Sequence, residues 1–195
     1  MGLDGAGKTT LKNMIMTAVN GDVTLENIIQ ATNTKPTIGY NLTRYAISSY
    51  KTFIFDLFDV GGLERIRNNW LRTWGFPEQI PQGVMFVVDS ADVERLTEAR
   101  EFLHDVLTAF QRIRVPVLVI ANKQDLPGAL NAREIAEKLS LSSHKDVCEV
   151  VVIRYTGLLK AIRKMCNLIN KREKKLKKLR ATQQVELKFI LTTQN

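Results

Sequence analysis

Residues 2–10 read GLDGAGKTT, and the first eight of them fit the pattern G-x-x-x-x-G-K-[ST] without a mismatch. Glycines in such a loop let backbone N–H groups close around phosphate oxygens, while a lysine reaches the β and γ phosphates and a hydroxyl binds Mg²⁺. In this chain these side chains are Lys8 and Thr9. A helix expected over 10–19 points its positive end at the anion. The stretch therefore predicts a phosphate loop; taken alone, it also fits a glycine-rich helix start without a ligand.

The rest of the chain alternates between two kinds of apolar pattern. Short runs rich in Val, Ile and Phe are typical of strands that are covered on both faces, and runs with helical spacing separate them. This alternation predicts an α/β fold, a P-loop NTPase with a mainly parallel sheet flanked by helices. Strands are expected at 52–58, 84–88, 115–121 and 150–153, and helices at 96–110, at 131–139 and from Leu158 onward.

The overall composition fits one globular domain. The chain has 195 residues, of which 45% are hydrophobic, and no apolar run approaches the roughly 18 residues of a membrane span. Cys148 and Cys166 form no C-x-x-C pair, and no secretory segment stands at the front. These features exclude wholesale disorder and a disulfide framework, and they predict an intracellular, cytoplasmic protein.

The net charge of +8 belongs to one segment. Residues 160–180 contain ten of the 28 lysines and arginines but only one of the 20 acidic residues, so the remainder is nearly neutral. We therefore expect a phosphate-binding domain over 1–170 and a basic helical extension and tail over 171–195. The run KREKKLKKLR at 171–180 is a solvated face of a protruding helix, a contact for an anionic membrane surface, or a site for an acidic partner or RNA. Specific nucleic-acid recognition is not expected.

A second motif, NKQD at 122–125, follows an apolar run. The loop at the carboxyl end of a parallel strand is where an α/β protein binds its ligand. The Asp125 carboxylate is suited to accept hydrogen bonds from both the ring N–H and the amino group of guanine, which adenine does not offer in that geometry. Beside a phosphate loop, this motif predicts a preference for GTP over ATP; alone, it would be an ordinary polar turn.

Two further motifs supply groups for Mg²⁺ and the γ-phosphate. DVGG at 59–62 contains an acid, Asp59, and a later glycine, Gly62, whose N–H is expected to donate to the γ-phosphate. PTIGYN at 36–41 provides a second hydroxyl, Thr37, on a loop. Segments held only by the γ-phosphate are ordered in one nucleotide state, so these two motifs together predict a switch.

With these motifs in view, the chain resembles the Arf and Arf-like branch of the Ras superfamily of small GTPases over roughly residues 2–170. The resemblance rests on GLDGAGKTT, PTIGYN, DVGG, FVVDSAD and NKQDLPGA. It implies the family fold, binding of GTP and GDP with Mg²⁺, and GTP-dependent recruitment of effector and regulator proteins and of membranes. LERIRNNW and LSLSSHKDVCEV are similar to the cilium-associated Arf-like proteins, which implies membrane trafficking and a peripheral membrane or ciliary location.

The sequence departs from the family pattern at several positions. Leu63 stands where the family has the glutamine that orients the attacking water, so we expect slow or absent hydrolysis and assign no catalytic residue. Arg154 stands where an alanine near the guanine is usual, which is expected to weaken base binding. Asp56 fits the family spacing from Thr37 better than Asp59 does, although only Asp59 has the glycine three residues on.

A further departure concerns the first strand of the sheet. A phosphate loop follows such a strand, but only Met1 precedes Gly2. Loss of a central strand is expected to leave neighbouring N–H and C=O groups unpaired and the domain poorly stable. Either the sequence is shortened or another segment fills the place, and the strand-like run VELKFIL at 185–191 is the late candidate.

These motifs predict a guanine-nucleotide switch. Two other functions stay open: a pseudo-GTPase that acts as an interaction module with weak nucleotide binding, and an ATP-using P-loop enzyme, which the NKQD motif disfavours. The predicted nucleotide ligands are Gly2, Asp4, Gly5, Ala6, Gly7, Lys8, Thr9, Thr10, Gly62, Asn122, Lys123 and Asp125, and the predicted Mg²⁺ ligands are Thr9, Thr37 and Asp59.

Overall fold

The structure, a computed structural model, describes residues 1–20, 25–46, 54–64, 67, 80–111, 113–144, 148–152 and 158–192. Helices and strands alternate along most of the chain, as the apolar pattern predicts. The helices are α1 (Lys8–Asn20), α2 (Leu25–Thr32), α4 (Leu96–Gln111), α5 (Ala132–Lys138), the 3-10 helix η2 (Leu141–His144) and α6 (Leu158–Thr192). The strands are β1 (Tyr40–Ala46), β2 (Ile54–Val60), β3 (Val84–Asp89), β4 (Val117–Asn122) and β5 (Cys148–Val152).

Strands β3, β4 and β5 form a parallel sheet in that order. Its middle strand is covered on both faces, because every residue over 117–121 is buried. Strands β1 and β2 form a separate antiparallel pair, in which Tyr40 lies opposite Val60 and Ala46 opposite Ile54. The predicted α/β class, with a mainly parallel sheet and flanking helices, is therefore confirmed.

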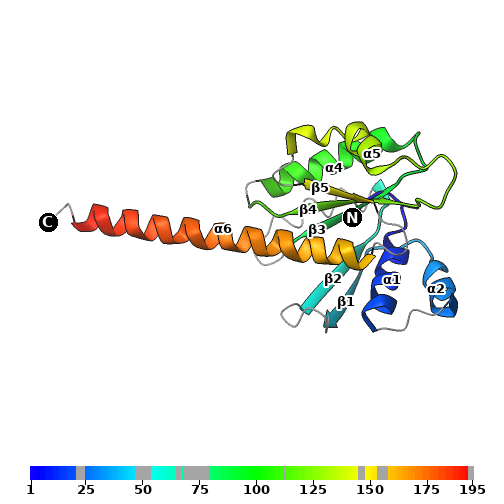
Figure 1. Ribbon diagram of the computed structural model, residues 1–195, viewed down its shortest axis with the longest axis horizontal. Helices are drawn as coiled ribbons and strands as arrows, with labels where there is room; N and C mark the ends of the chain where they lie inside the picture. The colour runs from blue at the N-terminus through cyan, green and yellow to red at the C-terminus, as the bar shows by residue number, and fades with distance from the viewer. Residues whose placement is uncertain are drawn as a thin grey trace.

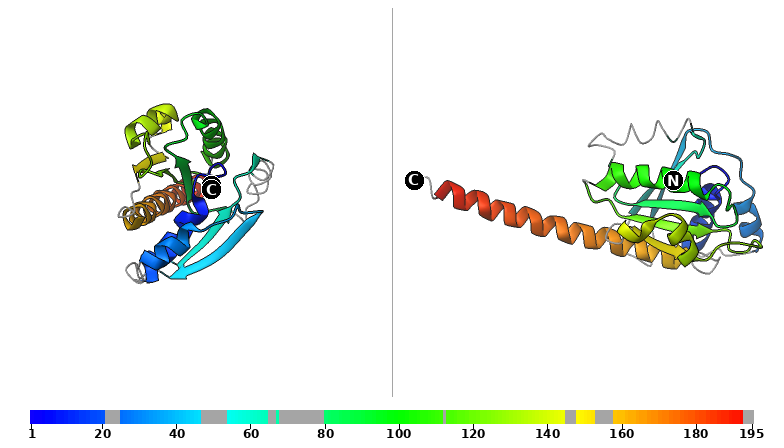
Figure 2. Two further views of the ribbon diagram at one scale, coloured as in Figure 1. Left: turned by 90° about the vertical axis from the view of Figure 1, so that its right-hand side faces the viewer. Right: turned by 90° about the horizontal axis from the view of Figure 1, so that it is seen from above.

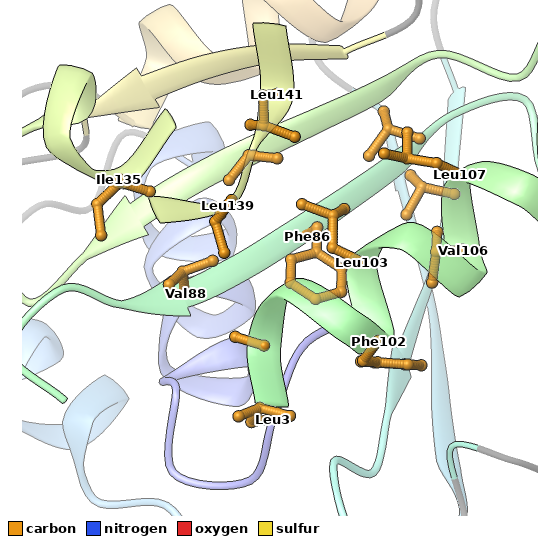
Figure 3. Packing of buried hydrophobic residues seen from close by; sticks show 14 of the residues in the cluster. Leu3, Phe86, Val88, Phe102, Leu103, Val106, Leu107, Ile135, Leu139 and Leu141 are labelled. Carbon is orange, nitrogen blue, oxygen red and sulfur yellow. The ribbon is translucent and has the colours of Figure 1, made fainter. Parts of the chain in front are cut away.

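Helices cover both faces of the parallel sheet (Figure 1). On one face α4 and α5 pack around Phe86, in the cluster shown in Figure 3. On the other face α1 and α6 pack on Leu118 and Ile120. The helix predicted over 96–110 is confirmed as α4, and apolar residues at helical spacing along it are buried: Leu96, Ala99, Phe102, Leu103, Val106 and Phe110.

Helix α5 begins with a capping box. The Asn131 side chain accepts hydrogen bonds from the N–H groups of Arg133 and Glu134, and the Glu134 carboxylate accepts from Asn131 N–H. This reciprocal arrangement pairs helix N–H groups that would otherwise lack partners. Helix α5 therefore begins where the sequence predicts, shortly after the base motif at 122–125.

The four predicted strands are present, with ends shifted by up to two residues. Residues 52, 53 and 153 of those predictions lie outside the described residues. Strand β1 and helix α2 were not predicted. In β1 the apolar side chains of Tyr40 and Leu42 are exposed, so the strand lacks the polar outer face that usually marks it.

Among the described residues, the two sheets share no strand ladder. Met1 lies beside β3: its amino group donates to Met85 O at 2.7 Å, and its carbonyl accepts from Val87 N–H at 2.8 Å. The hypothesis that residues 185–191 complete the sheet is wrong, because they are helical and belong to the distal part of α6. Glu186 and Lys188 are good helix formers that continue the preceding helical run.

Helix α6 begins in the domain and then projects away from it, so the division expected near residue 170 falls inside one continuous helix (Figures 1 and 2). Ile162, Met165 and Ile169 are buried, whereas Leu179 is 45% exposed. Arg172 interrupts this apolar stripe because its guanidinium donates twice to Ile113 O, at 3.0 and 3.2 Å. Beyond Arg172 the helix continues for 20 residues, a length of about 30 Å.

Candidate functional site

The phosphate loop, residues 2–7, leads directly into α1, and Asn122 fixes its shape. The Asn122 side chain donates from Nδ2 to the Ala6 carbonyl at 2.8 Å. Gly7 has a φ of +88°, and a Cβ at this position would collide with Asn122 Nδ2, so the loop needs glycine here. The loop therefore closes over the start of α1, where helix N–H groups are available to an anion.

Lys8 places a partly buried cation against this loop. Its ammonium donates to Leu3 O at 2.7 Å. Burial lowers the pKa of Lys8 to about 8, although the carboxylates of Asp59 and Asp4 act in the opposite direction. A cation whose pKa is depressed by burial is stabilised when an anion arrives. The residues present therefore fit a phosphate group at this place.

Three side chains that carry oxygen meet where α1 begins. Thr9 Oγ1 donates to Asp59 Oδ2 at 2.8 Å and lies 2.9 Å from Thr37 Oγ1. Asp59 is only 5% exposed. Hydroxyl and carboxylate oxygens are the ligands that Mg²⁺ takes beside nucleotide phosphates, so this set fits Mg²⁺. Asp56, the alternative ligand, is exposed and pairs with Arg44 across the β1–β2 ladder instead.

The base motif lies at the carboxyl end of β4, where the sequence predicts it. Lys123 has a φ of 59°, and its ammonium lies 2.6 Å from Asp89 Oδ2 at the end of β3. Gln124 Nε2 donates to Leu130 O at 2.9 Å. These contacts hold the turn and leave Asp125 exposed. The expectation for Arg154 falls on residues 153–157, which lie outside the described part of the chain.

Gly62 lies directly against the phosphate loop. A Cβ on Gly62 would collide with the backbone of Leu3 and Asp4, so this close approach requires glycine. Leu63 directly follows Gly62 in the chain and is half-buried. The Thr10 hydroxyl, also predicted at the site, lies 3.4 Å from that of Thr34.

A chain of ion pairs joins the phosphate loop to the segment that follows Gly62; we call it the charged relay. Arg95 Nη2 donates to Asp4 Oδ1 at 2.7 Å, and Arg95 Nε donates to Glu98 Oε2 at 3.0 Å. The other Glu98 oxygen accepts from Arg67 Nη2 at 2.6 Å. The relay thus consists of Asp4, Arg95, Glu98 and Arg67, and it passes the start of α4.

Arg67 forms the buried end of the relay. It is 6% exposed, and its guanidinium lies 5.0 Å from the centre of the Phe102 ring. The hydrogen bond from Arg95 holds the pKa of Asp4 below its usual range. Burial raises the pKa of Glu98, but the hydrogen bonds from Arg95 and Arg67 outweigh it, and that pKa is also lowered. Both carboxyl groups are therefore ionised at neutral pH, which keeps the relay paired.

Sequence reasoning missed the residues of the relay other than Asp4, and it missed Lys12. Asp4 offered a signal, because a carboxylate in a phosphate-binding loop needs a cation near it. Lys12 lies one helical turn after Lys8, so helical spacing places both ammonium groups on one side of α1. In the structure Lys12 Nζ lies 3.7 Å from Asp59 Oδ2.

The predicted site lies within the part of the chain that is similar to known proteins. The model of the ADP-ribosylation factor family matches residues 1–169, a range that includes each predicted nucleotide and Mg²⁺ ligand. Among solved structures, the chain is similar to the Arl6 BBS3 small GTPase from Trypanosoma brucei, which was determined with a bound nucleotide analogue, GppNp. The two chains share 27% sequence identity with a TM-score of 0.68, over 88% of this chain and 95% of that chain.

Proposed function

Because this chain belongs to the ADP-ribosylation factor family, we propose that it is a molecular switch that binds GTP and GDP. The observation that carries the proposal is the meeting of four motifs at one place: the phosphate loop, Thr37, the segment 59–62 and the base motif at 122–125. Contacts of 2.8 Å between Thr9 and Asp59, and between Asn122 and Ala6, connect these motifs directly. An anion cradle, a cation site and a base loop are what a nucleotide requires.

Each group has a task in this proposal. The backbone N–H groups of the phosphate loop and the Lys8 ammonium would hold the phosphates. Thr9, Thr37 and Asp59 would hold Mg²⁺, which supplies positive charge against the phosphates when it is bound. Asp125 would select guanine by accepting two hydrogen bonds.

Exposed apolar side chains beside Thr37 support the recruitment of effector and regulator proteins. Ile38 is 82% exposed, and Tyr40, Leu42 and Phe58 on the β1–β2 pair are also exposed. The rings of Tyr40 and Phe58 pack with their centres 6.0 Å apart. Contiguous exposed apolar surface is typical of a protein interaction site. We propose that this surface is displayed in the GTP state, because the adjoining loop carries a predicted Mg²⁺ ligand.

We also propose that GTP hydrolysis is slow or absent. Leu63 has no group that hydrogen-bonds an attacking water, and its apolar side chain arises next to the phosphate loop. The alternative is a pseudo-GTPase, an interaction module that has lost tight nucleotide binding. These two functions differ in nucleotide affinity, which is directly measurable.

Titration of the protein with fluorescent GDP in the presence of Mg²⁺ tests the proposal. We expect saturable binding at low micromolar concentration or tighter, because the loop, the cation site and the base loop act on one ligand. Unlabelled GTP should displace the probe and ATP should not, since the Asp125 carboxylate favours guanine. Absence of binding would favour the pseudo-GTPase, and equal competition by ATP would favour an ATP-using enzyme.

The lysines on one side of α6 support the proposal that the protein is cytoplasmic and binds peripherally to a membrane. Over residues 160–178 lysines recur at helical spacing, so they share one side of the helix along about 27 Å. Ile162, Met165 and Ile169 are buried on the opposite, domain-facing side. The acid Glu173 falls outside the lysine side by its position in the helical turn. This basic stripe consists of Lys160, Lys164, Lys171, Lys174, Lys175 and Lys178.

We propose that the basic stripe binds an anionic lipid surface. Each basic residue near such a surface contributes about 1 kcal/mol, and attachment by charge alone is reversible. The sequence has no aromatic residue between 158 and 180 on which nucleic-acid bases could stack. Searching the described residues reveals no helix with the length and apolar character of a membrane span. The similarity to cilium-associated Arf-like proteins supports a role in membrane trafficking at or near the cilium.

Neutralising three lysines of the basic stripe should weaken binding to phosphatidylserine vesicles by roughly a hundredfold, because about 1 kcal/mol is lost for each. Cosedimentation with vesicles measures the change, and raising the salt concentration should weaken binding of the unaltered protein. The variant combines Lys171→Gln, Lys174→Gln and Lys178→Gln.

The matched control removes the same charge from exposed positions elsewhere, with Lys35→Gln, Arg133→Gln and Lys138→Gln. This control should bind vesicles almost as well as the unaltered protein. Vesicle binding that is indifferent to salt, or an equal loss in the control, would contradict a lipid contact at the stripe. Preferential binding of an acidic protein or of RNA would reassign the stripe to that partner.

A further inference from the structure

Lys12 brings a second ammonium to the predicted Mg²⁺ site. It lies on α1, one helical turn after Lys8, and its Nζ is 3.7 Å from Asp59 Oδ2. That oxygen is the one that accepts the hydrogen bond from Thr9. The side chains of Lys12 and Asp59 are 12% and 2% exposed, so little water screens their attraction.

Lys8 and Lys12 have different partners although they share one side of α1. The Lys8 ammonium donates to the Leu3 carbonyl inside the phosphate loop, where the phosphates are expected. Lys12 follows Thr9 by three residues, which carries it past the loop to the carboxylate of Asp59. Lys12 therefore acts on the metal ligand rather than on the nucleotide.

Building on the proposed nucleotide function, we propose that Lys12 is a resident counter-cation of Asp59 that competes with Mg²⁺ for this carboxylate. A cation beside a carboxylate satisfies its charge before Mg²⁺ arrives, and it repels a divalent ion that approaches the same oxygen. The protein therefore needs a higher Mg²⁺ concentration to slow the release of GDP than its oxygen ligands alone would require. Lys12 is a positioning residue, because it acts through Asp59 and touches no reacting atom.

The rate of release of fluorescent GDP, measured over a series of free Mg²⁺ concentrations, tests this proposal. Lys12→Met removes the ammonium and keeps an unbranched side chain of similar length. The Mg²⁺ concentration that gives half of the full slowing of release should fall by about tenfold, the size of effect expected from one close charge. Lys12→Arg keeps the charge and should stay near the unaltered protein. A merely structural lysine would change the release rate equally at all Mg²⁺ concentrations.

A second measurement needs no nucleotide. In EDTA the Asp59 carboxylate of Lys12→Met has lost the ammonium that forms an ion pair with it, so the melting temperature should fall and Mg²⁺ should restore it. Lys138→Met, at an exposed position on α5, is the matched control and should melt like the unaltered protein in both conditions. Lys12→Gln repeats both measurements if the methionine variant does not fold.

The outcomes separate this proposal from the function on which it rests. An unmoved Mg²⁺ midpoint in a Lys12→Met protein that binds GDP overturns the role of Lys12. Melting in EDTA that is unchanged, or that Mg²⁺ does not restore, overturns it as well. Absence of GDP binding by the unaltered protein would overturn the proposed function instead, and the melting measurement would then decide on Lys12 by itself.

Discussion

Replacing Lys8 with methionine should weaken GDP binding by about a hundredfold or more. The ammonium lies partly buried against the phosphate loop, and loss of its charged hydrogen bonds to phosphate costs about 3 kcal/mol. Methionine keeps the apolar stem of the side chain and offers no donor. Equilibrium titration with fluorescent GDP measures the change. The matched control is Lys138→Met, which removes an exposed ammonium from the end of α5 and should leave the affinity unchanged.

The pH dependence of GDP binding gives the same prediction a second readout. Burial lowers the pKa of Lys8 to about 8 in the free protein, and bound phosphate favours the charged form and raises that pKa. Affinity should therefore be greatest below pH 8 and fall as the pH rises through that value. If Lys8→Met binds GDP as tightly as Lys138→Met does, Lys8 does not contribute to GDP binding.

Restoring a glutamine, with Leu63→Gln, should raise single-turnover GTP hydrolysis by about tenfold to a hundredfold. A positioned group that orients and polarises the attacking water contributes an effect of this order or more. Leu63 directly follows Gly62, whose backbone touches the phosphate loop, so a side chain at this position begins within the site. Phosphate release from protein preloaded with GTP measures the rate.

Leu179→Gln is the matched control, because it makes the same exchange at an exposed position on α6. It should hydrolyse GTP at the rate of the unaltered protein. If Leu63→Gln binds GTP normally and its rate equals that of the control, the absence of glutamine is not what limits hydrolysis.

The parallel core was predictable because burial on both faces demands uninterrupted apolar runs. Strand β4 is such a run, and every side chain over 117–121 is buried. Strand β1 escaped prediction because Tyr40 and Leu42 face solvent, and an apolar outer face hides the alternation of a half-buried strand. The strand prediction for residues 185–191 was wrong for a related reason. A short apolar run fits either a strand or a helix, and here it continues the helix that precedes it.

The site was predictable wherever its groups are neighbours in the sequence. The phosphate loop and the NKQD motif are contiguous, so the chemistry of each can be recognised locally. Contacts between distant residues give no such pattern: Arg95, just before α4, and Asp4 are 91 positions apart and meet only in the folded chain. The sequence could not decide between Asp56 and Asp59 as the Mg²⁺ ligand, because only the structure shows which carboxylate accepts a hydrogen bond from Thr9.

The charged relay links Arg67 to Asp4 through Glu98 and Arg95, so a change at one end alters the electrostatic environment of the other. If the segment after Gly62 docks a protein, as the proposed switch requires, this docking is coupled to the binding of a ligand at the phosphate loop. By thermodynamic reciprocity, each of the two binding events then changes the affinity of the other by the same factor.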